Sequence, residues 1–144
     1  KQGLNATRVY IIKNYPLRNE GLNYINNLPP KHKIRFAYIG KELTRYTGYH
    51  RDIRDSWKVL KKYLKMYRNN VELIVIGDDK LVSRGNIQST GFIKHVDMYR
   101  YLSEVHYGIL ALKPTVVHKY ASLLRTYVFA IIGVIPVISY PLTV

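Results

Sequence analysis

The chain has 144 residues, 47% of them hydrophobic, which suits one domain with a buried core and is too apolar for a disordered protein. The absence of Cys excludes a disulfide scaffold, thiolate chemistry and a Cys-based zinc site, and it fits the reducing cytoplasm. Lys and Arg number 23 against 9 Asp and Glu, a net charge of +14, which should attract nucleic acid, an anionic membrane surface or phosphorylated small molecules. The alternative is that the charge and the 14 Tyr reflect only solubility and adaptation to heat.

The first predicted strand covers residues 8–13 and ends at an Asn-Tyr-Pro turn, after which a proline-containing, basic connection follows. Residues 34–40 alternate between polar and apolar side chains and stop at a glycine, a pattern typical of a strand. The loop after this strand carries Lys41, Arg45 and Arg51. These side chains could neutralise a diphosphate, because a charge-assisted contact to phosphate is stronger than a neutral one. The alternative is a solvated basic loop.

Residues 52–67 have the periodicity of a helix. Apolar side chains recur at steps of three and four, and they are Ile53, Trp57, Leu60, Leu64 and Tyr67. Asp residues lie near the start of this segment and Lys and Arg residues near its end, as the helix dipole favours. We interpret the apolar stripe as core packing and the Lys residues as the exposed face of the helix, which could also contact an anionic membrane.

Residues 71–76 form a short apolar run rich in β-branched side chains, and the run stops at Gly77 and Asp78. Such a run is typical of a strand buried on both faces of a parallel sheet. Because it follows a strand and a helix, it predicts a βαβ unit with a right-handed crossover. Residues 86–93 predict a second, weaker strand, and the segment between the two strands is too short for a full helix. We interpret Asp78 as a turn or capping residue rather than a catalytic acid, and we predict no metal site because no further ligand-type residue is close in sequence.

The C-terminal part of the chain continues the alternation of helices and strands. A helix is predicted at 97–104, a strand at 107–112, a helix at 123–132 and a strand at 135–139. Residues 126–144 contain no charge, so a membrane span, which needs about 20 apolar residues, is an alternative for this stretch. Gly133 and Pro136 interrupt the run, and a buried helix followed by a strand explains it better.

A hydrophobic strand that ends in Gly-Asp, followed by the Asn-x-x-x-Thr-Gly-Phe-Ile segment of residues 86–93, resembles a known pattern. It is similar to the C-terminal, nucleotide-sugar-binding domain of GT-B glycosyltransferases, close to glycosyltransferase family 4. The strand before Pro114 and the helix that leads into Pro136 resemble further parts of that domain. The resemblance implies that residues 34–144 form an α/β domain, a Rossmann-like parallel sheet with helices on both faces. This domain could be truncated at its C-terminus. Residues 1–33 would be a linker strand and connection from an absent N-terminal domain.

The resemblance also implies a site for the donor at the carboxyl ends of the strands. The residues that it assigns to the donor phosphates are Gly40, Lys41, Arg45, Arg51, Ser122, Leu123, Leu124 and Arg125. Those assigned to the nucleobase are Gly91, Phe92 and Ile93, while Gly77 and Asp78 form the strand-end turn. Phosphate would meet backbone N–H groups at the start of the last helix, and exposed backbone groups after Gly91 would read the edge of the base. The alternative for Phe92 is packing under the sheet.

The chain departs from the family where two glutamates of the relatives contact the transferred sugar and the ribose. The matching positions here are Ala121 and Phe129, so an acceptor for sugar hydroxyls is missing where the fold would need it. The chain is therefore either a divergent glycosyltransferase whose donor contacts come from other residues, or an inactive GT-B-like fold. Arg125 lies in the first turn of the helix, against the dipole preference, and an anion docked there would compensate for this.

The sequence thus predicts a cytoplasmic, hexosyltransferase-like domain that binds a nucleotide-diphosphate sugar as substrate, for transfer to an unknown acceptor. No cofactor is expected, and a metal is not obligatory because basic side chains and helix dipoles can stabilise the charge on the leaving phosphate. Without its N-terminal domain it should be catalytically inactive. The alternative is a basic module that binds nucleic acid through phosphate contacts and Tyr stacking, although the Lys and Arg residues are scattered and no known motif is present. The positive charge could also bring the domain into peripheral contact with an anionic membrane.

Overall fold

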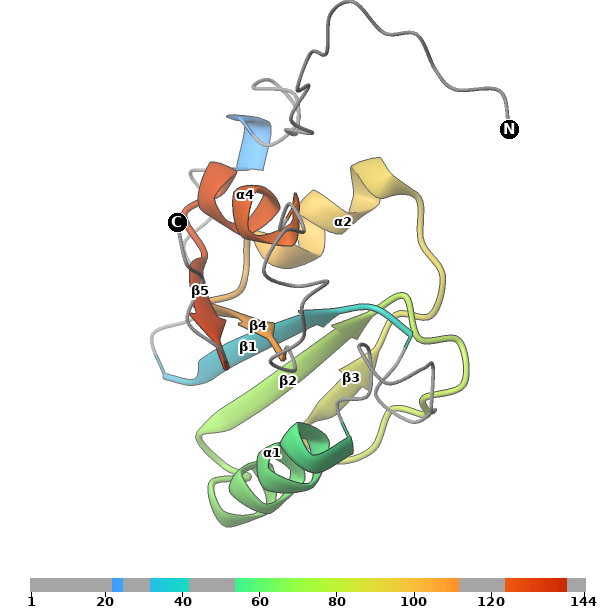
Figure 1. Ribbon diagram of the computed structural model, residues 1–144, viewed down its shortest axis with the longest axis vertical. Helices are drawn as coiled ribbons and strands as arrows, with labels where there is room; N and C mark the ends of the chain where they lie inside the picture. Colours follow the sequence, from blue (N-terminus) through green and yellow to red (C-terminus); the bar gives the residue numbers. More distant parts are fainter. Residues whose placement is uncertain (1–21, 25–31, 42–53, 112–123, 140–144) are drawn as a thin grey trace, which may run out of the picture.

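The computed structural model of the protein describes residues 22–24, 32–41, 54–111 and 124–139. Within these residues, five strands form one sheet in the order β3-β2-β1-β4-β5, and all neighbouring strands are parallel. The strands are β1 (Ile34–Ile39), β2 (Val71–Ile76), β3 (Ile87–Ser89), β4 (Tyr107–Leu110) and β5 (Ile135–Ile138). The helices are α1 (Arg54–Met66), α2 (His95–Leu102), α4 (Leu124–Ile131) and the short 3-10 turn η1 (Leu22–Tyr24). The predicted class, a Rossmann-like α/β fold with helices on both faces of a parallel sheet, is confirmed (Figure 1).

Strand β2 is buried on both faces, as its apolar run predicts. Leu73 and Val75 belong to the core on the side of α1, whereas Ile74 and Ile76 belong to the core under α2 and α4. Only Glu72 interrupts the buried pattern of the strand. Since side chains of a strand alternate between the two faces, a continuous apolar run is what a strand between two helical layers requires.

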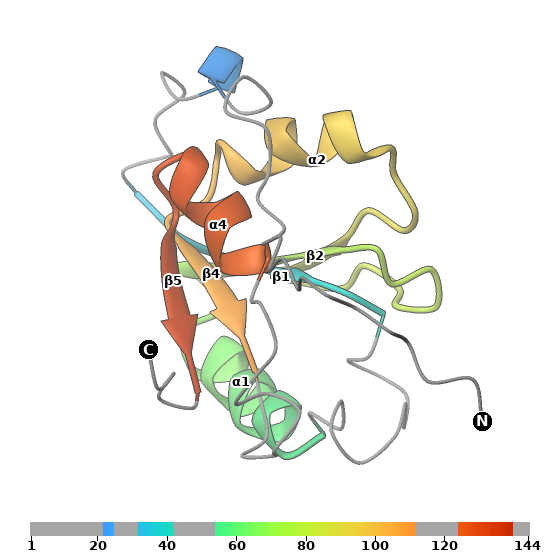
Figure 2. The same cartoon turned by 45° about the horizontal axis from the view of Figure 1, so that its top comes forward.

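The helices lie in two layers, with α1 on one face of the sheet and α2 and α4 on the other (Figures 1 and 2). Trp57 and Leu64 of α1 are buried against the sheet, as the apolar stripe predicts. Tyr67 was expected in the same stripe, and this prediction is wrong. The helix ends at Met66 and the side chain of Tyr67 is 47% exposed, because the helical periodicity no longer applies beyond the last turn.

Helix α4 and strand β5 confirm the interpretation of residues 124–138 as a helix followed by a strand. The helix ends in a Schellman motif: the N–H of Val134 donates to the carbonyl of Phe129 (3.0 Å), and the N–H of Gly133 donates to that of Ala130 (3.1 Å). Gly133 has a φ of 78°, the left-handed conformation that this motif requires. In the part of the chain that the structure describes, no helix has both the length and the apolar character needed to cross a membrane.

The boundaries of α2 and β3 differ from the predicted ones. Helix α2 begins at His95 rather than at residue 97, because Lys94 is the extended N-cap residue and its carbonyl already accepts the N–H of Asp97 (3.0 Å). In this helix Tyr99 is buried, while Tyr101 is only partly buried. Strand β3 spans three residues, with β2 as its only neighbour in the sheet. As predicted, no helix lies between β2 and β3. The strand predicted at residues 8–13 lies outside the described part.

Candidate functional site

The carboxyl ends of β1, β2 and β3 meet at one edge of the sheet, which we call the carboxyl rim (Gly40, Lys41, Gly77, Asp78, Gly91 and Phe92). The N–H of Gly40 donates to the carbonyl of Ile76 (2.9 Å), and the N–H of Gly77 donates to the carbonyl of Gly91 (2.9 Å). The three glycines that end the predicted strands therefore lie side by side. This arrangement is the one that a ligand site shared by these strand ends requires.

The backbone at Gly77 explains why glycine stands at the end of β2. Its φ of 97° is a conformation that residues with a side chain rarely adopt. A Cβ at this position would lie 3.9 Å from the backbone nitrogen of Gly40, an ordinary contact. Backbone strain, rather than a steric clash, therefore disfavours other residue types at this position. With glycine here, no side-chain atoms lie between the ends of β1 and β2.

The β1 end of the carboxyl rim borders the point where the order of the strands reverses, which lies between β1 and β4. The chain runs from β1 through β2 to β3 on one side of β1, and then returns past β1 to β4 and β5 on its other side. In open α/β sheets, ligands bind outside the carboxyl ends of the strands at such a switch point. Lys41 follows β1 by two residues and is exposed, so its ammonium group is available at this point.

Lys41 and Phe92, assigned by resemblance to the phosphates and to the base, are in contact across the rim. The ammonium nitrogen of Lys41 lies 3.7 Å from the centroid of the Phe92 ring, a cation–π contact. The side chain of Phe92 is 63% exposed, so the alternative that it packs under the sheet is wrong. Ile93 instead supplies the core contact, against the cluster under α2 and α4. The rim thus presents a cation and an exposed aromatic ring together.

The backbone groups of Gly91 are occupied within the protein. Its carbonyl accepts the N–H of Gly77 (2.9 Å) and the hydroxyl of Thr90 (3.0 Å), while its N–H donates to Oγ of Ser89 (3.4 Å). Gly91 therefore holds the rim together rather than offering groups to a ligand. If a base binds here, the backbone of Phe92 and Ile93 has to read its edge.

Asp78 is a fully buried carboxylate at the end of β2. Its Oδ1 accepts the N–H of Lys80 (3.1 Å), and its backbone carbonyl accepts the hydroxyl of Ser89 (3.0 Å). The predicted role as a turn residue is confirmed. Its Oδ2 is buried with no hydrogen-bond partner among the described residues. An unpaired buried carboxylate oxygen is costly, so this atom is a candidate acceptor for a buried water.

The start of α4 points towards the same edge of the sheet. Three residues separate the end of the helix from the start of β5 at the amino edge, so the N-terminus of the helix, with the positive end of its dipole, faces the carboxyl edge. Leu124 is exposed there and Arg125 is half-buried. Phe129, at one of the expected glutamate positions, is fully buried and offers nothing to a ligand. The remaining predicted positions, Arg45, Arg51, Ala121, Ser122 and Leu123, lie outside the described residues.

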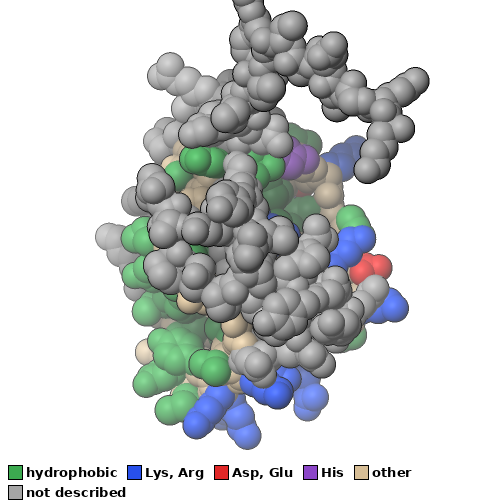
Figure 3. All heavy atoms as spheres, in the orientation of Figure 1, with side chains coloured by type: hydrophobic (Ala, Val, Ile, Leu, Met, Phe, Trp, Pro, Cys, Tyr) green, Lys and Arg blue, Asp and Glu red, His purple; other side chains and the backbone are tan. Residues whose placement is uncertain are grey.

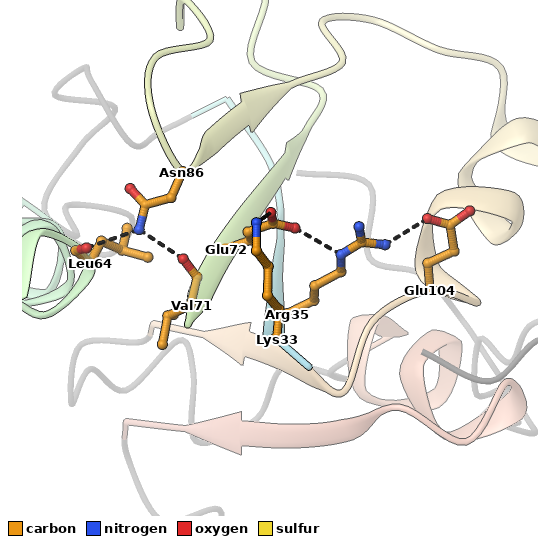
Figure 4. A network of polar contacts seen from close by, with 7 residues as sticks. All are labelled: Lys33, Arg35, Leu64, Val71, Glu72, Asn86 and Glu104. Carbon is orange, nitrogen blue, oxygen red and sulfur yellow. Dashed lines mark hydrogen bonds and ion pairs between the residues drawn. The ribbon is translucent and has the colours of Figure 1, made fainter. Parts of the chain in front are cut away.

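Sequence reasoning missed an ion-pair cluster at the opposite, amino edge of the sheet (Figure 4). Glu72 pairs with Lys33 (2.5 Å) and with Nε of Arg35 (2.9 Å), and Arg35 also pairs with Glu104 (2.8 Å). The hydrogen bond from Lys33, aided by Arg35 and opposed by burial, holds the pKa of Glu72 below its usual value. The one signal in the sequence was Glu72 itself, a single charge within an apolar strand.

His106 joins this cluster through the backbone. Its Nδ1 accepts the N–H of Arg35 (3.1 Å), so the ring is neutral at that nitrogen. Burial, together with the charge of Arg35, lowers the pKa of His106. The histidine therefore secures the start of β1 against β4 and has the character of a structural residue.

A pocket of about 390 Å³ lies beside the cluster, lined by Arg35, Glu72, Arg84, Asn86 and Gln88 among others. Its polar groups are largely engaged in the fold. The amide nitrogen of Asn86 donates to the carbonyls of Leu64 (2.9 Å) and Val71 (2.8 Å), and the carboxylate of Glu72 is paired with two cations. The pocket is also at the amino edge of the strands, away from the switch point. We therefore favour the carboxyl rim as the functional site.

Comparisons with protein-family models, with curated protein sequences and with solved structures find no match for this chain. Geometry alone supports the site. No group of three or more metal-ligating side chains occurs in the described ranges.

Proposed function

We propose that the carboxyl rim binds a nucleotide-diphosphate sugar and that the domain is the donor half of a GT-B glycosyltransferase resembling family 4. The observation that supports this most is the junction of the strand ends next to the switch point, where Lys41 after β1 contacts Phe92 after β3. A cation beside an exposed aromatic ring suits a ligand that joins phosphates to a flat base.

In this proposal the chain's own residues bind and orient the donor. Lys41 contributes a charge-assisted contact to the diphosphate, and the dipole of α4 favours a second anionic group at its start. Phe92 provides a face on which a base can stack. When an acceptor hydroxyl attacks the anomeric carbon, the bond to the diphosphate breaks, and the same positive groups stabilise the charge that develops on the leaving phosphate.

The buried Phe129 limits how the sugar can be held. Because that position offers no polar group, the hydroxyls of the sugar need acceptors from elsewhere. The enzyme would therefore be a divergent member of its class, and its acceptor site would lie in another domain.

A thermal-shift screen of this chain against UDP, GDP and their sugar conjugates tests the proposal. We expect saturable stabilisation by one base series, since a ligand that binds only the folded state raises the unfolding temperature. Single-stranded DNA or RNA serves as the comparison ligand. Binding of nucleic acid that falls steeply with salt, with no stabilisation by any nucleotide, would replace the proposal with the nucleic-acid alternative.

A further inference from the structure

Among the helices that the structure describes, α1 alone lies on its face of the sheet (Figures 1 and 2). Its inward side is defined by the buried Trp57 and Leu64 and the half-buried Leu60. Successive residues of a helix are rotated by about 100°, so residues 59, 62 and 66 project away from this side. The outward side of α1 therefore faces solvent.

Large apolar side chains stand on that outward side. They are Val59 (70% exposed) and Met66 (65%); Tyr63 (40%) and Tyr67 (47%) lie at the flank, where the ring of Tyr63 meets that of Phe36 on β1 edge-on at 6.4 Å. Val59, Tyr63 and Met66 follow the spacing of neighbours along one helix face. Single exposed apolar residues are common on protein surfaces, but a contiguous strip is typical of an interaction surface.

Positive side chains flank this apolar strip. They are Lys58, Lys61, Lys62, Lys65 and Arg68, all exposed. The sequence between Ser56 and Asn70 contains no acidic residue. Lys61 leans towards the sheet, with its ammonium 5.5 Å from the centroid of the Trp57 ring, whereas Lys62 projects outward beside Met66. Figure 3 shows Lys and Arg side chains gathered at the end of the molecule where α1 lies.

We propose that the outward face of α1, defined by Val59, Lys62, Tyr63, Lys65 and Met66, docks on an anionic lipid bilayer. The helix would lie in the plane of the interface, with its apolar side chains below the headgroups and its lysines extended towards the lipid phosphates. Charge complementarity selects this partner, because an anionic leaflet attracts clustered lysines at close range. Nucleic acid would engage the lysines but would leave Val59 and Met66 exposed.

Co-sedimentation with vesicles tests this docking, using pure phosphatidylcholine and phosphatidylcholine mixed with phosphatidylserine. We expect the protein to bind only the anionic vesicles. The double variant Val59→Ser/Met66→Ser and the double variant Lys62→Glu/Lys65→Glu should each weaken that binding at least about tenfold. All four side chains are exposed, so both variants should keep the unfolding temperature of the parent.

Matched control variants carry the same chemical changes elsewhere. Val82 (80% exposed), between β2 and β3, and Val96 (59% exposed), in α2, are not part of α1, and Val82→Ser/Val96→Ser should bind vesicles like the parent. Lys80→Glu/Lys94→Glu should retain most of the binding for the same reason. Equal loss in test and control variants would overturn the proposal. So would a loss confined to the charge variant, because that result would describe a general attraction to polyanions without insertion of the apolar strip.

Discussion

The ring of Phe129 fills the space next to the Cα of Gly108, where any side chain would overlap it. Phe129 is fully buried in α4, and Gly108 is in β4, paired with Ala37 of β1. The contact brings the helix close to the sheet beside the switch point. Phe129 is thus a packing residue, and the small residue on β4 is its complement.

Gly108→Ala should therefore destabilise the protein by about 1–3 kcal/mol, since the added methyl group forces the Phe129 ring to move within a packed core. Thermal or urea unfolding measures this change. The matched test is the same substitution in a Phe129→Leu background, where the smaller side chain leaves room and the added cost should shrink. An equal cost in both backgrounds would show that the ring is not the obstacle.

Asn86 ties the end of α1 to the start of β2 through its two amide hydrogen bonds. Asn86→Ala should cost about 1–3 kcal/mol in unfolding free energy, because it leaves partly buried carbonyls without a donor. Gln88→Ala, at an exposed position two residues further on, is the control and should change stability little. Similar losses in both variants would contradict the role of Asn86.

Stability should fall on acidification in two separable windows. The pKa of His106 is lower in the folded state than its usual value of 6.5. As the pH falls below about 6.5, the unfolded chain therefore binds a proton at His106 before the folded chain does, and the free energy of unfolding decreases. The pKa of Glu72 is lowered from 4.5, so its contribution is lost as the pH falls from that value through the folded pKa. Urea unfolding against pH measures both effects. His106→Gln should remove only the first decline and Glu72→Gln only the second; a variant that leaves its own window unchanged would refute that assignment.

Arg125 tests the start of α4 as part of the donor site. It is half-buried in the first turn, where a positive charge is unfavourable unless an anion is near. Arg125→Glu should weaken binding of a nucleotide diphosphate at least about tenfold, or about 1.4 kcal/mol. Calorimetric titration gives the affinity, with Arg84→Glu at the amino edge as the control. Unchanged affinity would remove Arg125 from the site.

Much of the fold was predictable because β1, β2 and β4 are short apolar runs punctuated by glycine or proline, and α1 has a clear stripe. The exposure of the Phe92 side chain was not predictable, since an aromatic residue after a strand can point either to the core or to solvent. Its direction depends on the backbone conformation at Gly91. The pairing of Glu72 with Arg35 depends on the register between β1 and β2 (Arg35 lies opposite Glu72), which sequence spacing does not reveal. The role of Asn86 was not predictable either, because its side chain bonds to backbone carbonyls, and patterns of side-chain types in the sequence do not reveal such contacts.

The carboxyl rim as the ligand site is tested most directly by amide NMR of the labelled chain during titration with the nucleotide that stabilises it best. We predict that the shifted amides cluster at Gly40, Lys41, Gly77 and Phe92, and that Lys41→Ala weakens binding about tenfold. Lys80→Ala, close by but outside the proposed contacts, should bind like the parent. Shifts centred instead on the amino-edge pocket around Arg35 and Asn86 would contradict the account.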